Sequence, residues 1–282
     1  MKALTFNPLV SVNIPTRNAE RTLGFCLEAL ARQTYPNLEV IVADGLSTDG
    51  SRRIAEKYGV RLVTCSGGLL EARLRAFQAS KGDYIMLVDA DQVLRSDTVE
   101  RAVRMAEEGY DMLVLEEESW PYCRGFIPAL YKASKEVINR RLGEPWALEP
   151  GRGFFVPRFF RRSLLEKAFN AIPPSLISKV IHYDHDSLYY ECWKRSKRIG
   201  VVRKAVYHIE PDWRKLWKTN VRYGSSLNVF SGCEQYRSLL AKGESRIYFG
   251  RPLHLGLQAL LLTLILKTVQ GIGRIIYHPT VK

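Results

Sequence analysis

The sequence predicts an α/β fold: a mostly parallel central sheet with helices on both faces, followed by a C-terminal helical region that associates with a membrane. Two observations predict it. Through residues 1–115, short apolar runs alternate with segments whose apolar residues have helical spacing, the pattern of a parallel sheet covered on both faces. Near the C-terminus, an almost wholly apolar run covers residues 253–266.

Each element of the first half follows from local periodicity. Five apolar runs predict strands over residues 9–14, 38–43, 60–63, 84–88 and 111–115. Four segments between them predict helices over residues 19–33, 51–58, 69–79 and 98–108. In the first of these helices, Leu23, Leu27 and Leu30 recur at helical spacing. Beyond Glu116 the alternation breaks down, and we expect a helix opening near Ser187.

Aromatic and basic residues interleave in the second half, in segments near residues 120–126, 152–162 and 213–223. Because Trp and Tyr favour the headgroup level and cations favour anionic lipid, these segments favour membrane contact. The apolar run 253–266 is shorter than the roughly 20 residues of a spanning helix, unless Lys267 snorkels. A short span and a helix lying in the interface both fit, and a buried core helix is the remaining alternative.

Composition sets limits on the function. The chain has 282 residues, 46% of them hydrophobic, which is enough for one large domain or a domain with an appendage. Its formal net charge of +13 suits polyanionic partners such as nucleic acid, anionic lipid or phosphorylated substrates. The five cysteines show no metal-ligand spacing, so we expect free thiols in a reducing compartment. The N-terminal residues do not have the pattern of a signal peptide.

Acidic side chains follow two of the expected strands. Asp89 and Asp91 come directly after the strand over residues 84–88, and Asp44 follows the strand over residues 38–43. The carboxyl ends of parallel strands face the crevice in which open α/β sheets bind ligands. Mg²⁺ and Mn²⁺ take oxygen ligands and often share them with substrate phosphates. This pattern predicts a metal-assisted site for a nucleotide or diphosphate, while Asp49 fits better as a cap of the next helix.

Three segments carry a resemblance to a known family: residues 10–18, residues 44–51 and residues 82–91. In order and spacing they resemble family 2 glycosyltransferases, which have the GT-A fold, a Rossmann-like arrangement. The resemblance covers roughly the first 115 residues and is more specific than any single motif. It implies inverting transfer of a sugar from a nucleotide diphosphate donor, with Mn²⁺ or Mg²⁺ as cofactor.

The resemblance also implies roles for individual residues of the first half. Pro15 and Asp44 fall where the family holds the nucleoside, and Arg73 falls where an Ala-Arg-Asn segment contacts the donor. Asp89 falls at the ribose or metal position, and Asp91 at the metal ligand. For Arg73 an exposed helix position, paired with Glu71 or Asp44, is an equal alternative.

Three further residues match the family in the second half. Asp186 falls at the general base that removes the proton of the acceptor hydroxyl, although Asp184 is a rival two residues earlier. Residues 205–208 resemble a late strand of the family that ends in a histidine, so His208 would complete the metal shell or touch a phosphate; a merely hydrogen-bonded histidine is the alternative. Arg222 resembles the cation of a Gln-x-x-Arg-Trp motif and suits the departing diphosphate. The changed neighbours, Thr219 and Tyr223, favour one sugar per encounter over processive synthesis.

The likeness to dolichol-phosphate mannose synthases and cellulose-synthase-like proteins favours mannose transfer from GDP-mannose to a lipid-linked acceptor at the cytoplasmic membrane face. We expect a catalytic domain over residues 1–210, with a nucleotide-sugar half (1–115) and an acceptor half (116–210), and interface helices over residues 211–282. Alternatives are a soluble UDP-sugar glycosyltransferase acting on a glycan or protein, and a basic nucleic-acid-binding protein. A sugar-nucleotide pyrophosphorylase fits less well, because no glycine-rich basic loop follows the first strand.

Overall fold

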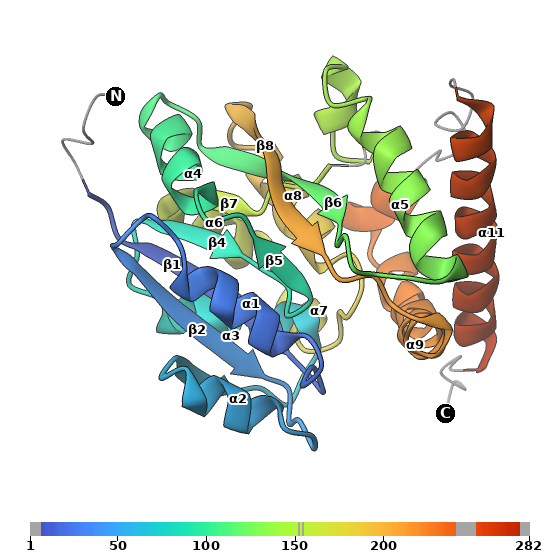
Figure 1. The fold of residues 1–282 in the computed structure, drawn as a ribbon, viewed down its shortest axis with the longest axis horizontal. Coiled ribbons are helices and arrows are strands. Elements are labelled where there is room, and N and C mark those ends of the chain that lie inside the picture. The colour runs from blue at the N-terminus through green and yellow to red at the C-terminus, as the bar shows by residue number, and fades with distance from the viewer. Residues whose placement is uncertain (1–6, 152, 154, 241–251, 277–282) are drawn as a thin grey trace.

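The computed structural model describes residues 7–151, 153, 155–240 and 252–276, and its centre is one eight-stranded sheet (Figure 1). The strands are β1 (Val10–Thr16), β2 (Leu38–Asp44), β3 (Arg61–Thr64), β4 (Tyr84–Leu87), β5 (Gln92–Leu94), β6 (Met112–Ser119), β7 (Phe159–Arg161) and β8 (Ile199–His208). Their order across the sheet is β3-β2-β1-β4-β7-β6-β8-β5.

The two halves of the sheet differ in strand direction. Strands β3, β2, β1 and β4 run parallel, as the alternation of strand and helix predicts. Strand β7 then pairs antiparallel with both β4 and β6, β6 pairs parallel with β8, and β5 closes the edge antiparallel to β8. The expectation of a mostly parallel sheet therefore holds for the first half, and the second half is mixed.

Helices cover both faces of the sheet (Figure 1). They are α1 (Leu23–Ala31), α2 (Ser51–Lys57), α3 (Leu69–Ala79), α4 (Thr98–Glu107), α5 (Phe126–Asn139), α6 (Arg162–Ala171), α7 (Pro174–Ile177), α8 (Asp184–Trp193), α9 (Trp213–Ser231), α10 (Arg237–Leu240) and α11 (Leu253–Ile276), with 3₁₀ turns at Pro145–Leu148 and Glu234–Tyr236. Because successive side chains of a strand point to opposite faces, Met86 packs with α1 and α4 while Ile85 and Leu87 pack with α3, α6 and α8.

The predicted elements of the first half are confirmed, with ends shifted by a few residues. Two features were not predicted: the three-residue strand β5, and the continuation of β6 to Ser119. The idea that the aromatic and basic residues near 155–162 favour membrane contact is wrong for Phe159 and Phe160. They are 1% and 0% exposed, because β7 inserts them into the core between β4 and β6. Arg152 and Phe154 lie outside the described residues.

The apolar C-terminal run forms part of α11, which lies at one edge of the molecule beside α5 and α9 (Figure 1). Its backbone approaches α9 closely: a Cβ atom at Gly224 would overlap the carbonyl group of Gln270, and one at Gly273 would overlap that of Val221. The other side of the helix exposes apolar side chains: Leu253, Leu257, Leu260, Leu261, Leu264, Ile275 and Ile276.

This helix is long and apolar enough to cross a membrane, with a mean hydropathy of 1.6 over its best 18-residue window. Only 22% of that window is buried, so the helix does not have the environment of a core helix. Its exposed leucines instead form an apolar face that faces away from the protein.

Candidate active site

A cavity of about 420 Å³ opens at the carboxyl ends of β1 and β4, where an open α/β sheet places its ligand crevice. The loop after β1, the start of α3, the turn between β4 and β5, the first turn of α8 and one side of α9 surround it. The structure brings nearly all predicted site residues to this cavity: Pro15, Arg73, Asp89, Asp91, Asp184, Asp186, His208 and Arg222.

Asp44 is the exception, because its carboxylate lies below the cavity surface. It is 0% exposed, accepts a hydrogen bond from the Ser47 amide and pairs with Arg52 at 3.2 Å. Only its neighbour Gly45 lines the cavity. Asp49 does not line the cavity; it lies one residue before Gly50, the N-cap of α2, and accepts bonds from the amide and hydroxyl of Ser51.

The turn between β4 and β5 positions the two carboxylates after β4. The Asp89 amide donates to the side-chain oxygen of Gln92, and the Gln92 amide donates back to the Asp89 carbonyl. The Asp91 carbonyl accepts a bond from the Ile209 amide at 2.8 Å, which ties the turn to the end of β8. Because β5 and β8 pair antiparallel, with Gln92 opposite His208, this turn and the end of β8 meet at the cavity.

Asp91 and His208 face each other across this junction. Asp91 Oδ1 lies 3.5 Å from His208 Nε2, and His208 Nδ1 lies 3.0 Å from Glu210. Burial would raise the pKa of Glu210, but His208 and Lys135 outweigh it and lower that pKa to about 2. Burial and Lys135 would lower the pKa of His208, but Asp91 and Glu210 outweigh them and raise it.

These residues fit a divalent cation. A metal-binding histidine usually has its other ring nitrogen held by a carboxylate, as Glu210 holds His208 here. No group of three or more His, Cys, Asp or Glu side chains with ligand geometry occurs in the described part of the chain. Asp91 and His208 would therefore supply two ligands, with the remainder from a diphosphate and water, as is common for Mg²⁺. Lys215 Nζ also lies 3.1 Å from Asp91, at its second oxygen.

The other end of the cavity holds a buried charge cluster. Arg73 is 0% exposed and binds both Asp89, at 2.7 Å, and Asp184. The alternative of an exposed Arg73 paired with Glu71 or Asp44 is therefore wrong, because α3 turns this side chain inward. Its Nη1 has no hydrogen-bond partner in the described structure, which leaves a buried donor beside a cavity suited to a polyanion.

Arg158 completes the cluster, and sequence reasoning missed it as a site residue. It binds the second oxygen of Asp89 at 2.7 Å and contacts His185 Nε2. Burial would raise the pKa of Asp89, but Arg158 and Arg73 hold it well below its usual range. With both oxygens on arginines, Asp89 does not fit the expected role of a direct metal ligand. Knowledge that β7 runs antiparallel to β4 would have placed Arg158 at the carboxyl end of β4.

The two candidate bases lie in different surroundings. Helix α8 begins at Asp184, so both carboxylates belong to its first turn. Asp184 is 5% exposed and bound to Arg73, which with His185 lowers its pKa against the opposing effect of burial. Asp186 is half-buried and lines the cavity.

Helix α9 supplies the remaining wall. Lys215, Thr219, Arg222 and Tyr223 recur at helical spacing and line the cavity. The ring of Tyr223 stacks on His182, with centroids 4.5 Å apart and planes within 5°. Lys215 and Tyr223 were not predicted as site residues; their spacing of four residues on either side of Thr219 is the signal that could have found them.

Comparisons with known proteins agree with this architecture. The family model described as Glycosyl transferase family 2 matches residues 11–169. Among curated proteins, glycosyltransferase GlyG of Streptococcus pneumoniae is 32% identical over 216 residues, covering 71% of this chain and 69% of that protein. The chain spans 60% of the length of two other curated relatives, both from Bacillus subtilis.

Solved structures show a similar fold. Residues 1–349 of TarS from S. aureus, solved in complex with UDP-GlcNAc, superpose with a TM-score of 0.58 at 17% identity, covering 93% of this chain and 81% of that one. Mannosyltransferase PcManGT from Pyrobaculum calidifontis, solved with GDP-Man and Mn²⁺, gives a TM-score of 0.56 at 21% identity, covering 98% and 82%. Sequence identities of 17% and 21% show that these proteins share the fold of this chain.

Proposed function

The chain belongs to glycosyl transferase family 2, and from this premise we propose that it is an inverting, metal-dependent glycosyltransferase that uses a nucleotide diphosphate sugar. The observation that carries the proposal is that Asp91 and His208 face each other at 3.5 Å in the cavity that Asp186 also lines. The family match favours this enzyme over the nucleic-acid-binding protein that the net charge alone allows.

Asp186 is the proposed general base. Inversion in one step requires a group that accepts the proton of the acceptor hydroxyl as its oxygen attacks the anomeric carbon. Asp184 suits this role less, because its buried bond to Arg73 stabilises the unprotonated form.

Cations around the cavity are proposed to bind the diphosphate. Lys215 and Arg222 approach from α9, and Arg73 has the buried unpaired donor. Asp91 and His208 would hold Mn²⁺ or Mg²⁺, which when bound neutralises charge on the departing diphosphate. Pro15 and Asp44 stay predictions as nucleoside contacts; for Asp44, Arg52 would have to move aside.

For the donor we propose GDP-mannose, with a UDP-sugar donor for a glycan or protein acceptor as the second candidate. The likeness to dolichol-phosphate mannose synthases and the fold shared with PcManGT support GDP-mannose. The fold shared with TarS, which was solved with UDP-GlcNAc, and the match to GlyG support a UDP-sugar. The two donors differ in the base that the region around Gly45 would contact.

We propose that α11 lies in a membrane interface and brings the cavity to a lipid-linked acceptor on the cytoplasmic side. Its exposed leucines form the apolar face, and Trp213 and Trp217 of the adjoining α9 are 51% and 41% exposed. Aromatic rings of this kind favour the headgroup level. On this proposal, residues 1–210 form the catalytic part, although α9 beyond them also lines the cavity.

Vesicle flotation of the full chain tests the membrane proposal. The double variant Leu257→Gln/Leu264→Gln removes apolar area from the exposed face and is expected to shift protein from anionic vesicles to the soluble fraction. Leu46→Gln is the matched control, because Leu46 is also exposed, at 52%, but lies after β2. Equal flotation of all three proteins would refute the membrane role of α11.

Donor assays test the catalytic proposal. Thermal shifts with UDP- and GDP-sugars, each with and without Mn²⁺ or Mg²⁺, should show stabilisation by one donor class. Donor hydrolysis or transfer with that class should require the metal. If Asp91→Ala retains full metal-dependent activity, the assignment of Asp91 is wrong.

A further inference from the structure

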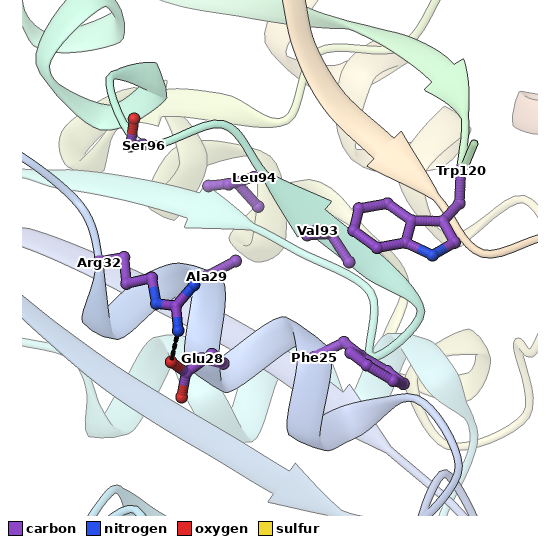
Figure 2. Close-up of a pocket in the computed structure, with 8 residues that line it drawn as sticks. All are labelled: Phe25, Glu28, Ala29, Arg32, Val93, Leu94, Ser96 and Trp120. Atoms are coloured by element: carbon purple, nitrogen blue, oxygen red, sulfur yellow. Dashed lines mark ion pairs between the residues drawn. The ribbon is translucent and has the colours of Figure 1, made fainter. Parts of the chain in front are cut away.

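A second hollow lies outside the reaction cavity, in the groove between α1 and β5 (Figure 2). Its volume is about 240 Å³. Phe25 and Trp120 lie at one end, Val93 forms the middle, and Arg32 and Ser96 lie at the other end (Figure 2). None of these side chains has a part in the catalytic proposal.

The groove combines aromatic walls with a charged edge. Phe25 is 55% exposed although its ring lies 6.5 Å from that of Trp120. At the other end, Arg32 pairs with Glu28 at 2.6 Å, and Glu28 also accepts a bond from the Tyr58 hydroxyl. A ligand here would meet apolar ring surface on one side and charged hydrogen-bonding groups on the other.

The groove lies close to the reaction cavity, although no residue lines both. Thr22, the N-cap of α1, lines the cavity, and Phe25 in the first turn of that helix lines the groove. The Trp120 amide donates to the carbonyl of His208 at 2.8 Å, so the residue that carries the aromatic wall is bonded to a residue of the cavity. A chain-like acceptor whose end reacts in the cavity would have to pass this junction to reach the groove.

We propose that this groove binds one pyranose unit of the acceptor, at a distance from the unit that receives the sugar. The proposal rests on the proposed glycosyltransferase function. Drug-sized ligands occupy pockets of roughly 300–1,000 Å³, so the smaller volume suits a single sugar ring. A pyranose presents a face of C–H groups, which suits the negative face of an aromatic ring. Its hydroxyl groups lie at the ring edge, where Glu28 and Arg32 offer an acceptor and donors.

Fluorine NMR of the full chain labelled with 5-fluorotryptophan tests the proposal. The probes are methyl α-mannopyranoside, methyl β-glucopyranoside and N-acetylglucosamine, with cyclohexanol as a ring that lacks the hydroxyl edge. The resonance of Trp120 is assigned by its loss in Trp120→Phe. It should shift with at least one pyranoside at millimolar concentration and respond less to cyclohexanol.

Matched variants locate the binding. Phe25→Ala should weaken the affinity for that pyranoside about tenfold, a loss typical of a stacked aromatic contact. Phe126→Ala makes the same change at a ring that is 64% exposed outside the groove, and it should leave the affinity unchanged. A Trp120 signal that no pyranoside moves, cyclohexanol binding as strong as the sugars, or equal effects of the two variants would each overturn the proposal.

Nucleotide binding, measured in the same samples by adding UDP and GDP, separates this proposal from the proposed function. If a pyranoside binds but neither UDP nor GDP does, the glycosyltransferase site is refuted and the sugar-binding groove remains. Nucleotide binding without any pyranoside effect would refute the groove alone.

Discussion

The two ends of the reaction cavity use similar side chains in different ways. At the end formed by α3 and β7, Arg73 and Arg158 bind Asp89 and Asp184, and the side chains of these four residues are at most 27% exposed. At the end formed by α9, Lys215 is 46% exposed and shares Asp91 with His208. At the first end the carboxylates are held by buried arginines, whereas at the second end Asp91 is held by a half-exposed lysine and a histidine.

The difference indicates which carboxylates do chemistry. A buried, fully paired carboxylate fixes the positions of strands and helices, and removing one partner leaves an uncompensated buried charge. A carboxylate whose partner is an exposed, flexible lysine can exchange that partner for a cation. Substitutions at the paired end should therefore affect stability most, and those at the open end should affect catalysis most.

The largest expected effect is on turnover in Asp186→Asn. Loss of a general base typically lowers kcat about 10²–10⁴-fold. Because Asp186 lies on the cavity wall, the variant should keep the Tm and the donor affinity of the wild type. Steady-state kinetics and thermal unfolding check this. A variant with full turnover would remove Asp186 from the mechanism.

Asp184→Asn provides the comparison two residues away. It removes the carboxylate charge that faces the fully buried Arg73, so we expect the free energy of unfolding to fall by roughly 3–5 kcal/mol. Urea unfolding at neutral pH measures this. If Asp184→Asn is as stable as the wild type, the charges at this end are not fixed as described.

Acid should weaken the paired end in particular. The pKa values of Asp89 and Asp184 are lowered in the fold, so the stability that they contribute is present above the ordinary value of 3.8 and is lost as the pH falls through their folded values. Wild-type stability should therefore fall steeply below about pH 4, and Asp184→Asn should show a shallower slope. Urea unfolding between neutral and acid pH gives both slopes; parallel slopes would contradict the pairing.

The smallest effect is expected where α9 meets α11. A methyl group at Gly224 would overlap the backbone of Gln270, so Gly224→Ala should cost roughly 1–3 kcal/mol. Gly271→Ala is the control, because no atom lies within 4 Å of its added Cβ, and it should be neutral or slightly stabilising. Thermal unfolding compares them, and equal Tm values would argue against the close crossing.

The sequence predicts the open end of the cavity better than the paired end. Asp91 follows the predicted strand β4, and His208 ends β8, whose last residues the family resemblance identifies. Only the pairing that joins them, β8 with the short strand β5, was not predicted. Helix α3 was predicted with its observed ends, but the direction of Arg73 depends on Asp184, which is 111 residues away. Local patterns carry no information on such a partner.

Arg158 shows why the second half was harder to predict. Strand β7 has only three residues, too few for a period to be recognised, and its direction is set by pairing with β4 and β6. Strand β5 is equally short and was not predicted for the same reason, so the groove between α1 and β5 was not predicted either. Long-range strand pairing, rather than local propensity, determines these parts of the molecule.

Calorimetric titration of Mn²⁺ into the full chain, with saturating UDP or GDP, tests the central claim most directly. The wild type should bind Mn²⁺ in the presence of one of these nucleotides. Asp91→Asn should weaken this binding by at least about tenfold, since even partners of metal ligands contribute that much. Equal affinity of wild type and variant, or no Mn²⁺ binding with either nucleotide, would contradict the assignment of this cavity as a metal-assisted donor site.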